Sequence, residues 1–262
     1  MQISLSINPE QEVKKITKFL KKIQKKTGIN KVVIGLSGGV DSTTVHYLLK
    51  KAYKLENIIV VHLPYSSIKS IVNEFVKVTG VEGKGIPAAR SRGALFEAST
   101  DGNEPETGPA TKQKIRLGNI VARVRMIILF DLAKKHNALV CGTENKSERL
   151  LGYFTRFGDA ASDIEPIVHL YKTQIYQLAK YLKVPQKIID VKPTAGFWKG
   201  QTDEGEFGFT YEGADQVLHL YFDKKIVAKE IKKLGFKNVE KIIKRFLKNK
   251  FKQEVPYSLL RK

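Results

Sequence analysis

The sequence predicts an α/β fold in which a doubly wound parallel sheet is flanked by helices. Three short apolar runs rich in β-branched residues, at 31–36, 57–63 and 138–142, are separated by segments with helical periodicity. Such alternation is typical of parallel strands joined by crossover helices. A glycine-rich turn follows the first run, and the 262 residues are enough for one large domain.

The first half of the chain supports this alternation element by element. Asn8, Pro9 and Gln11 predict the start of a helix, because they supply a cap residue, a first-turn proline and a capping-box partner. Apolar residues then recur at helical spacing until Gly28. After the first strand, the pattern predicts a helix over 43–54, the second strand, and a helix over 67–79 that ends at Gly80.

The second half contains two segments without a clear period. Residues 87–108 predict an exposed loop, and 191–211 predict a long functional loop whose part 196–209 orders over bound nucleotide. Between them, the pattern predicts helices over 111–136, 144–151 and 171–182, the third strand, and a loop over 153–163. Further helices are expected from residue 212 onward.

Charge and composition restrict the function classes. The chain has 46 basic and 26 acidic residues, a formal net charge of +20, which favours polyanionic partners in general. Much of the excess is lysine at helical spacing, so we favour solvated helix faces over a nucleic-acid surface. No signal peptide or apolar stretch of about 20 residues is evident, which disfavours a membrane location. The single cysteine, Cys141, fits the cytoplasm.

The most informative stretch is Ser37-Gly38-Gly39-Val40-Asp41-Ser42, between the first strand and the following helix. Glycines let the backbone approach a ligand closely, and the N–H groups at a helix start bind anions. Asp41 would repel phosphate unless a cation lay between them, and Mg²⁺ is commonly held by one or two carboxylates plus phosphate oxygens. The loop therefore predicts a pyrophosphate site with a metal ion.

Two other classes of function remain open from these residues. Residues 35–39 also fit G-x-S-x-G, the nucleophile elbow of serine hydrolases, with Ser37 as nucleophile. Its partners would be Asp131 or Asp163 with His169 or His219. A non-catalytic nucleotide-binding or RNA-binding protein is the other alternative.

The glycine loop resembles the pyrophosphate loop of the N-type ATP pyrophosphatases. Three further segments, at 118–126, 142–166 and 192–204, contain Gly118-Asn119, Phe154-Thr155-Arg156-Phe157-Gly158-Asp159 and Lys192-Pro193-Thr194. Together with the loop, they resemble ammonia-dependent NAD synthetase. The resemblance implies a Rossmann-like fold of the adenine nucleotide alpha hydrolase-like type, and a single NAD synthetase domain over 1–262 with no glutaminase domain.

The resemblance also implies a reaction and a set of site residues. The family amidates deamido-NAD to NAD with ammonia, through an acyl-adenylate, and releases AMP and pyrophosphate. Asp41, Glu148 and Lys172 would be catalytic, and Asp41 and Glu148 would bind Mg²⁺. ATP, as co-substrate, would be bound by Gly35, Leu36, Ser37, Gly38, Gly39, Val40, Asp41, Ser42, Thr143, Lys172 and Thr194. Deamido-NAD would be bound by Arg123, Arg156, Asp163, Phe251 and Lys252.

Some positions depart from the family pattern. Phe251-Lys252 stands where the family often has His-Lys, and Arg156 stands where it usually has lysine. The resemblance further implies a homodimer with small-molecule substrates and no nucleic-acid partner. A tRNA-modifying adenylating enzyme of the same superfamily is the alternative that the positive charge supports.

Overall fold

The three strands form a parallel sheet in the order β2-β1-β3 in the computed structural model. The structure describes residues 3–79, 109–194, 201–254 and 259. Strand β1 (Lys31–Gly35) lies between β2 (Ile58–Val61) and β3 (Ala138–Cys141), with Val33 opposite both Ile59 and Val140. A central first strand with its successors on either side confirms the predicted Rossmann-like α/β fold.

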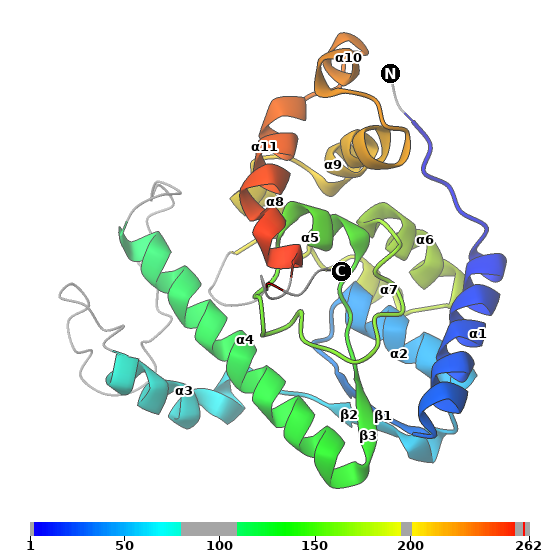
Figure 1. Ribbon diagram of the computed structural model, residues 1–262, viewed down its shortest axis with the longest axis vertical. Coiled ribbons are helices and arrows are strands. Elements are labelled where there is room, and N and C mark those ends of the chain that lie inside the picture. The colour runs from blue at the N-terminus through cyan, green and yellow to red at the C-terminus, as the bar shows by residue number, and fades with distance from the viewer. Residues whose placement is uncertain (1–2, 80–108, 195–200, 255–258, 260–262) are drawn as a thin grey trace.

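Alternating side chains of β1 face two separate helical layers. Val32 and Ile34 are buried in a core with α1 (Pro9–Thr27), α2 (Val40–Ala52) and α6 (Lys172–Tyr181). Val33 is buried on the opposite face, against α4 (Pro109–His136). Helix α3 (Tyr65–Thr79) packs on α4, and Figure 1 shows these two helices on the side away from α1. Both faces of the sheet are therefore covered, as parallel sheets require.

A second core joins the helices that end the chain. It contains residues of α9 (Tyr211–Leu218), α10 (Ala228–Lys233) and α11 (Val239–Asn249), together with Leu151 of α5 (Lys146–Leu151). In Figure 1 these C-terminal helices lie above the carboxyl ends of the strands. The remaining short elements are α7 (Gln186–Ile189), α8 (Asp203–Phe207), and the turns Leu55–Asn57, His219–Asp223 and Lys250–Gln253.

Most helix boundaries agree with the sequence to within a few residues. Asn8 caps α1 by accepting a hydrogen bond from the Gln11 amide, and Gly28 ends the helix with φ 72°. Helix α2 begins at Val40 rather than at residue 43, so that Asp41 lies in its first turn. Among the described residues, no helix is long and apolar enough to cross a membrane.

The prediction that 191–211 lacks regular structure is wrong for its second half. Helix α8 lies there, capped by Thr202 at its start and ended by Gly208 with φ 66°. A helix of five residues is too short to show an apolar period, although the cap residue and the glycine were both visible in the sequence. Residues 87–108 and 195–200 lie outside the described ranges, so the expectations for them remain predictions.

Candidate active site

A cavity of about 1030 Å³ lies at the carboxyl ends of the three strands. Its lining includes residues that directly follow each strand: 36–42 after β1, 62–65 after β2 and 142–143 after β3. Helices α4 and α11 supply further walls. Open α/β sheets bind ligands at this edge, where neighbouring crossovers leave in opposite directions.

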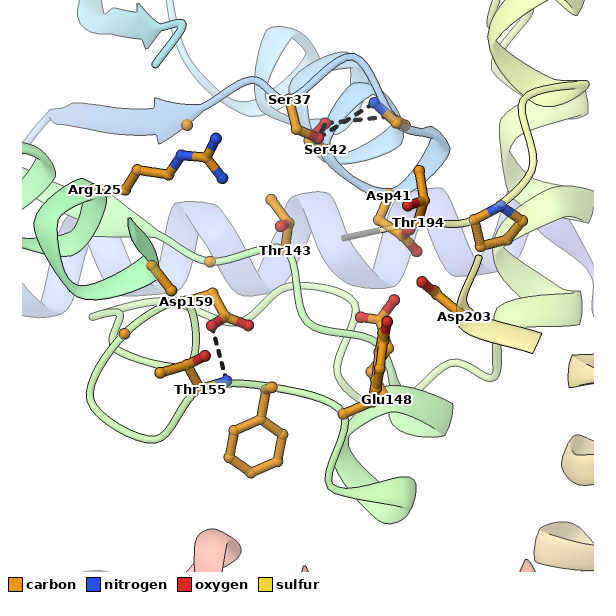
Figure 2. A pocket seen from close by; sticks show the side chains of 18 of the residues that line it. Ser37, Asp41, Ser42, Arg125, Thr143, Glu148, Thr155, Asp159, Thr194 and Asp203 are labelled. Atoms are coloured by element: carbon orange, nitrogen blue, oxygen red, sulfur yellow. Dashed lines mark hydrogen bonds between the residues drawn. The ribbon is translucent and has the colours of Figure 1, made fainter. Parts of the chain in front are cut away.

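The glycine loop forms one end of the cavity. Gly38 has a φ of 87°, a conformation that favours glycine, and Gly39 is the N-cap of α2. The Ser37 and Ser42 hydroxyls lie 3.0 Å apart, and the Ser37 hydroxyl accepts a hydrogen bond from the Gly39 amide. Figure 2 shows both serines beside the start of this helix. The loop thus directs hydroxyls and the positive end of α2 at one place, an arrangement suited to an anion.

A buried lysine joins the two predicted metal-binding carboxylates. Lys172 Nζ lies 2.5 Å from Asp41 Oδ2 and 3.2 Å from Glu148 Oε1. Only 3% of the Lys172 side chain is exposed, against 16% and 17% for the two acids. The structure therefore brings all three predicted catalytic residues into direct contact, from α2, α5 and α6.

This arrangement controls the charge of each group. Burial lowers the pKa of Lys172, but the charges of Asp41 and Glu148 outweigh it and raise the pKa above its ordinary value. Burial raises the pKa of Glu148, while the Lys172 charge opposes that shift. Lys172 therefore stays a cation between the two carboxylates.

Asn145 fixes Asp41 and Glu148 relative to each other. Its side-chain oxygen accepts from the Glu148 amide at 3.0 Å, and the Glu148 carboxylate accepts from the Asn145 amide at 3.4 Å. This is a capping box at the start of α5. The Asn145 side-chain nitrogen also donates to Asp41 Oδ1 at 2.9 Å. Sequence reasoning missed Asn145, although the N-x-x-E pattern of residues 145–148 marks such a cap.

The predicted ATP-binding residues all line the cavity. Gly35 to Ser42, Thr143, Lys172 and Thr194 belong to its wall. Thr143 comes just after β3, and Figure 2 shows it between the glycine loop and the Thr155–Asp159 turn. These residues come from four separate segments of the chain and together form one polar end of the cavity.

The predicted dinucleotide-binding residues divide into two groups. Lys252 lines the cavity and donates to the carbonyl oxygens of Gly152 and Phe154. The other four lie outside the lining. Arg123 donates to the Arg156 carbonyl, Arg156 to the Glu254 carbonyl, and Asp163 accepts from the Val140 amide. Phe251 is about half exposed, at 48%.

Several cavity residues were not predicted from the sequence. Arg125 of α4 lines the cavity, and its Nε donates to the Leu63 carbonyl. Asp203 is 3% exposed and accepts a hydrogen bond from the Tyr211 hydroxyl, and its buried Oδ1 has no hydrogen-bond partner among the described residues. Figure 2 shows Asp203 beside Glu148 and Thr194. The basic residues of α11 that line the wall are Lys241, Lys244, Arg245 and Lys248.

The serine hydrolase alternative lacks its triad in the structure. His169 pairs with Glu12 at 2.9 Å, and His219 pairs with Asp223 at 2.9 Å. Neither histidine lines the cavity that contains Ser37. Within the described part of the chain, the Ser37 hydroxyl contacts the Ser42 hydroxyl and the Gly39 amide, and neither of these groups is a base that could activate it.

Fold and cavity together define a class: an α/β protein with a glycine loop suited to an anion beside paired carboxylates at the sheet edge. The NAD synthase family model matches residues 12–256. A Fusobacterium nucleatum protein named NH(3)-dependent NAD(+) synthetase is 40% identical over 261 residues, 96% of each chain. A protein of the same name from Thermoplasma volcanium is 37% identical and covers 95% of this chain and 97% of its own. The chain belongs to the NAD synthase family.

Solved structures agree with this membership. An NH3-dependent NAD synthetase from Campylobacter jejuni has a TM-score of 0.70 and 28% identity, covering 97% of this chain and all of its own. An NMN synthetase from Francisella tularensis has a TM-score of 0.72 and 28% identity, covering 97% and 99%. The predicted family is thereby confirmed, and the chain is a ligase that forms a C–N bond. These findings do not favour the tRNA-modifying, serine hydrolase or non-catalytic alternatives.

Proposed function

We propose that the chain amidates deamido-NAD with ammonia, using ATP and releasing AMP and pyrophosphate, at the cavity above the sheet. The observation that carries this assignment is the buried Lys172 between Asp41 and Glu148, next to a glycine loop at a helix start. This group of charges can hold a triphosphate and its counter-ion at one end of a cavity large enough for a second substrate.

The donor set fits Mg²⁺. Two carboxylates, Asp41 and Glu148, already share one cation, the Lys172 ammonium, at distances of 2.5 and 3.2 Å. Within the described ranges, no three His, Cys, Asp or Glu side chains form a metal cage by themselves. Mg²⁺ usually takes one or two carboxylates, with phosphate oxygens and waters completing its shell. When bound, it would supply charge neutralisation of the phosphates.

The protein residues have distinct roles in the first half-reaction. The loop from Ser37 to Ser42 holds phosphate oxygens, Lys172 donates to the leaving pyrophosphate, and Thr143 and Thr194 contact ATP. An oxygen of the nicotinate carboxylate attacks the α-phosphorus of ATP. The bond to the bridging oxygen of pyrophosphate breaks, and an acyl-adenylate forms. Orientation and charge neutralisation are the main contributions of the protein.

The second half-reaction replaces AMP by ammonia. The ammonia nitrogen attacks the acyl carbon, the bond to the AMP oxygen breaks, and one proton leaves the nitrogen. In this proposal Lys252 contacts the dinucleotide from the cavity wall. Arg123, Arg156, Asp163 and Phe251, which lie outside the lining, contact the part of it that extends beyond the cavity. The contact between Arg123 and the Arg156 carbonyl supports a shared role for the two arginines.

An assay that omits one component at a time tests the activity. The purified chain with ATP, Mg²⁺, deamido-NAD and ammonium should form NAD and AMP in equal amounts, and none when any component is absent. Asp41→Asn should lower turnover at least about 100-fold, because it removes the half-buried charge that pairs with Lys172. Asp190→Asn changes an exposed aspartate and serves as the control. Near-normal turnover of Asp41→Asn at ordinary Mg²⁺ would contradict the assignment.

The Francisella tularensis structure raises a second candidate substrate, because that protein is named an NMN synthetase. NMN is the amide of nicotinic acid mononucleotide, so the same chemistry acts on a substrate without the adenylate half. Comparing kcat/KM for deamido-NAD and for nicotinic acid mononucleotide distinguishes the two. We expect deamido-NAD to be preferred, in agreement with the more similar relatives from Fusobacterium nucleatum and Thermoplasma volcanium.

We also propose that the chain forms a homodimer. This proposal rests on the family resemblance alone. Light scattering coupled to size-exclusion chromatography measures the mass in solution. A mass near twice 29.5 kDa supports the dimer, and a mass near 29.5 kDa at micromolar concentration contradicts it.

A further inference from the structure

Asp215 is a completely buried carboxylate that lies outside the cavity lining. It belongs to α9 and is 0% exposed. Its Oδ1 accepts a hydrogen bond of 2.5 Å from the Ser147 hydroxyl, and its Oδ2 accepts one of 2.9 Å from the Thr173 amide. Both partners are adjacent in sequence to charged residues of the site, Glu148 and Lys172.

Ser147 extends this connection to Lys172 itself. The Ser147 hydroxyl accepts a hydrogen bond of 2.8 Å from the Lys172 amide while it donates to Asp215. Three helices therefore meet through two side chains: α5 through Ser147, α6 through its first two amides, and α9 through Asp215. The backbone segments that carry Glu148 and Lys172 are fixed to each other at this point.

The start of α6 explains why a charge is tolerated in the interior. Burial raises the pKa of Asp215 and its hydrogen bonds with Ser147 and Thr173 oppose that shift, which leaves the pKa at about 6. The first amides of a helix have no partners within the helix and carry partial positive charge, so an aspartate there is favourable. An apolar residue would pack in this position but could not accept these bonds, which would leave the Thr173 amide unpaired.

We propose that Asp215 is a positioning residue: by holding Ser147 and the first turn of α6, it keeps Glu148 and Lys172 in contact and so sets the affinity for a nucleoside triphosphate with its divalent cation. This inference rests on the proposed function, because it takes the Lys172 site as the triphosphate site. It assigns no contact between Asp215 and substrate.

Equilibrium binding tests the proposal without turnover. Calorimetry measures the Kd of a non-hydrolysable ATP analogue with Mg²⁺ for the full chain and its variants. Asp215→Ala and Ser147→Ala should each weaken binding at least about tenfold, since each releases an amide at the start of α6. Asp215→Asn keeps an acceptor for Thr173 and a polar contact with Ser147, so its Kd should stay within about threefold of the native value.

The matched control is Val217→Ala, another fully buried position of α9 that takes no part in this hydrogen-bond network. It should lower the melting temperature but leave the Kd unchanged. Equal effects of Val217→Ala and Ser147→Ala on the Kd would overturn the positioning role. If Asp215→Ala does not fold, the comparison of the Kd of Ser147→Ala with that of Val217→Ala tests the proposal by itself. Absence of binding by the native chain would instead contradict the proposed function.

Discussion

Lys172 is the residue on which the site depends most directly. It is buried to 97% of its side-chain surface, and it contacts two carboxylates from different helices. Removing one member of a buried ion pair leaves the other charges uncompensated, which costs far more than the loss of an exposed pair.

Lys172→Met should therefore abolish most nucleotide binding. The variant leaves Asp41 and Glu148 facing each other without a counter-charge and removes a donor to phosphate. We expect kcat/KM for ATP to fall by about 100-fold or more, corresponding to roughly 3 kcal/mol. Steady-state kinetics measures this, with Lys180→Met, an exposed position of the same helix, as the control. Equal kcat/KM values for Lys172→Met and Lys180→Met would contradict the role of Lys172.

Glu144 should make the stability of the folded chain depend on pH. The residue is 6% exposed, and burial, together with the nearby charge of Glu165, raises its pKa to about 8 from an ordinary value of 4.5. The folded chain thus favours the protonated form. This contribution to stability is fully present below pH 4.5 and is lost as the pH rises through about 8.

Glu144→Gln removes that titration, so its melting temperature relative to the native chain should increase from pH 5 to about pH 8. Thermal unfolding at a series of pH values measures the difference. Glu56→Gln, whose side chain is 74% exposed in the native chain, should show no such trend. A pH-independent difference for Glu144→Gln would contradict the assigned pKa.

At the scale of elements, two asparagine helix caps allow the effect of a cap on stability to be measured apart from its effect on the site. Asn8 caps α1 far from the cavity, whereas Asn145 caps α5 and also donates to Asp41. Each cap is worth about 1 kcal/mol. Only Asn145 also affects the geometry of the site.

Asn8→Ala should lower the melting temperature and leave the KM for ATP unchanged. Asn145→Ala should lower the melting temperature and raise the KM for ATP, because Asp41 loses its donor and Glu148 its capping partner. Unfolding curves and ATP titrations of both variants provide the comparison. An unchanged KM in a folded Asn145→Ala variant would show that the bond to Asp41 is dispensable.

Local patterns account for what the sequence could predict of these elements. The strands and long helices follow from apolar periodicity, and the glycine loop follows from its place between β1 and α2. The resemblance supplied Glu148 and Lys172, but nothing local indicates that Lys172 contacts both acids. Asp215 and Arg125 were missed because their partners lie 42 to 68 and 62 residues away, and only the tertiary fold brings them together.

At the scale of the whole molecule, the net charge of +20 should affect which polyanions the chain binds, and this can be measured. Lysines on the outer faces of helices, such as Lys15 and Lys18 of α1, are exposed. Charges of this kind attract polyanions at low salt but are screened near physiological ionic strength. The basic residues of α11 differ, because they line the cavity.

We expect binding of tRNA to the chain to fall steeply between roughly 50 mM and 200 mM salt, as for non-specific phosphate contacts. At the upper value, added tRNA should leave the rate of NAD formation unchanged. Filter binding and the NAD assay at matched salt concentrations measure both. Tight tRNA binding that persists at high salt would support the alternative of a tRNA-modifying enzyme.

The one cysteine of the chain gives the sheet a chemical reporter of its own. Cys141 ends β3 directly before Gly142 and Thr143, is 2% exposed, and burial raises the pKa of its thiol well above the ordinary value. Although Cys141 belongs to the cavity lining, its small exposure and raised pKa should make alkylation slow in the native chain. Transient separation of this strand from its surroundings should speed up modification, so the labelling rate reports on how often the floor of the cavity opens.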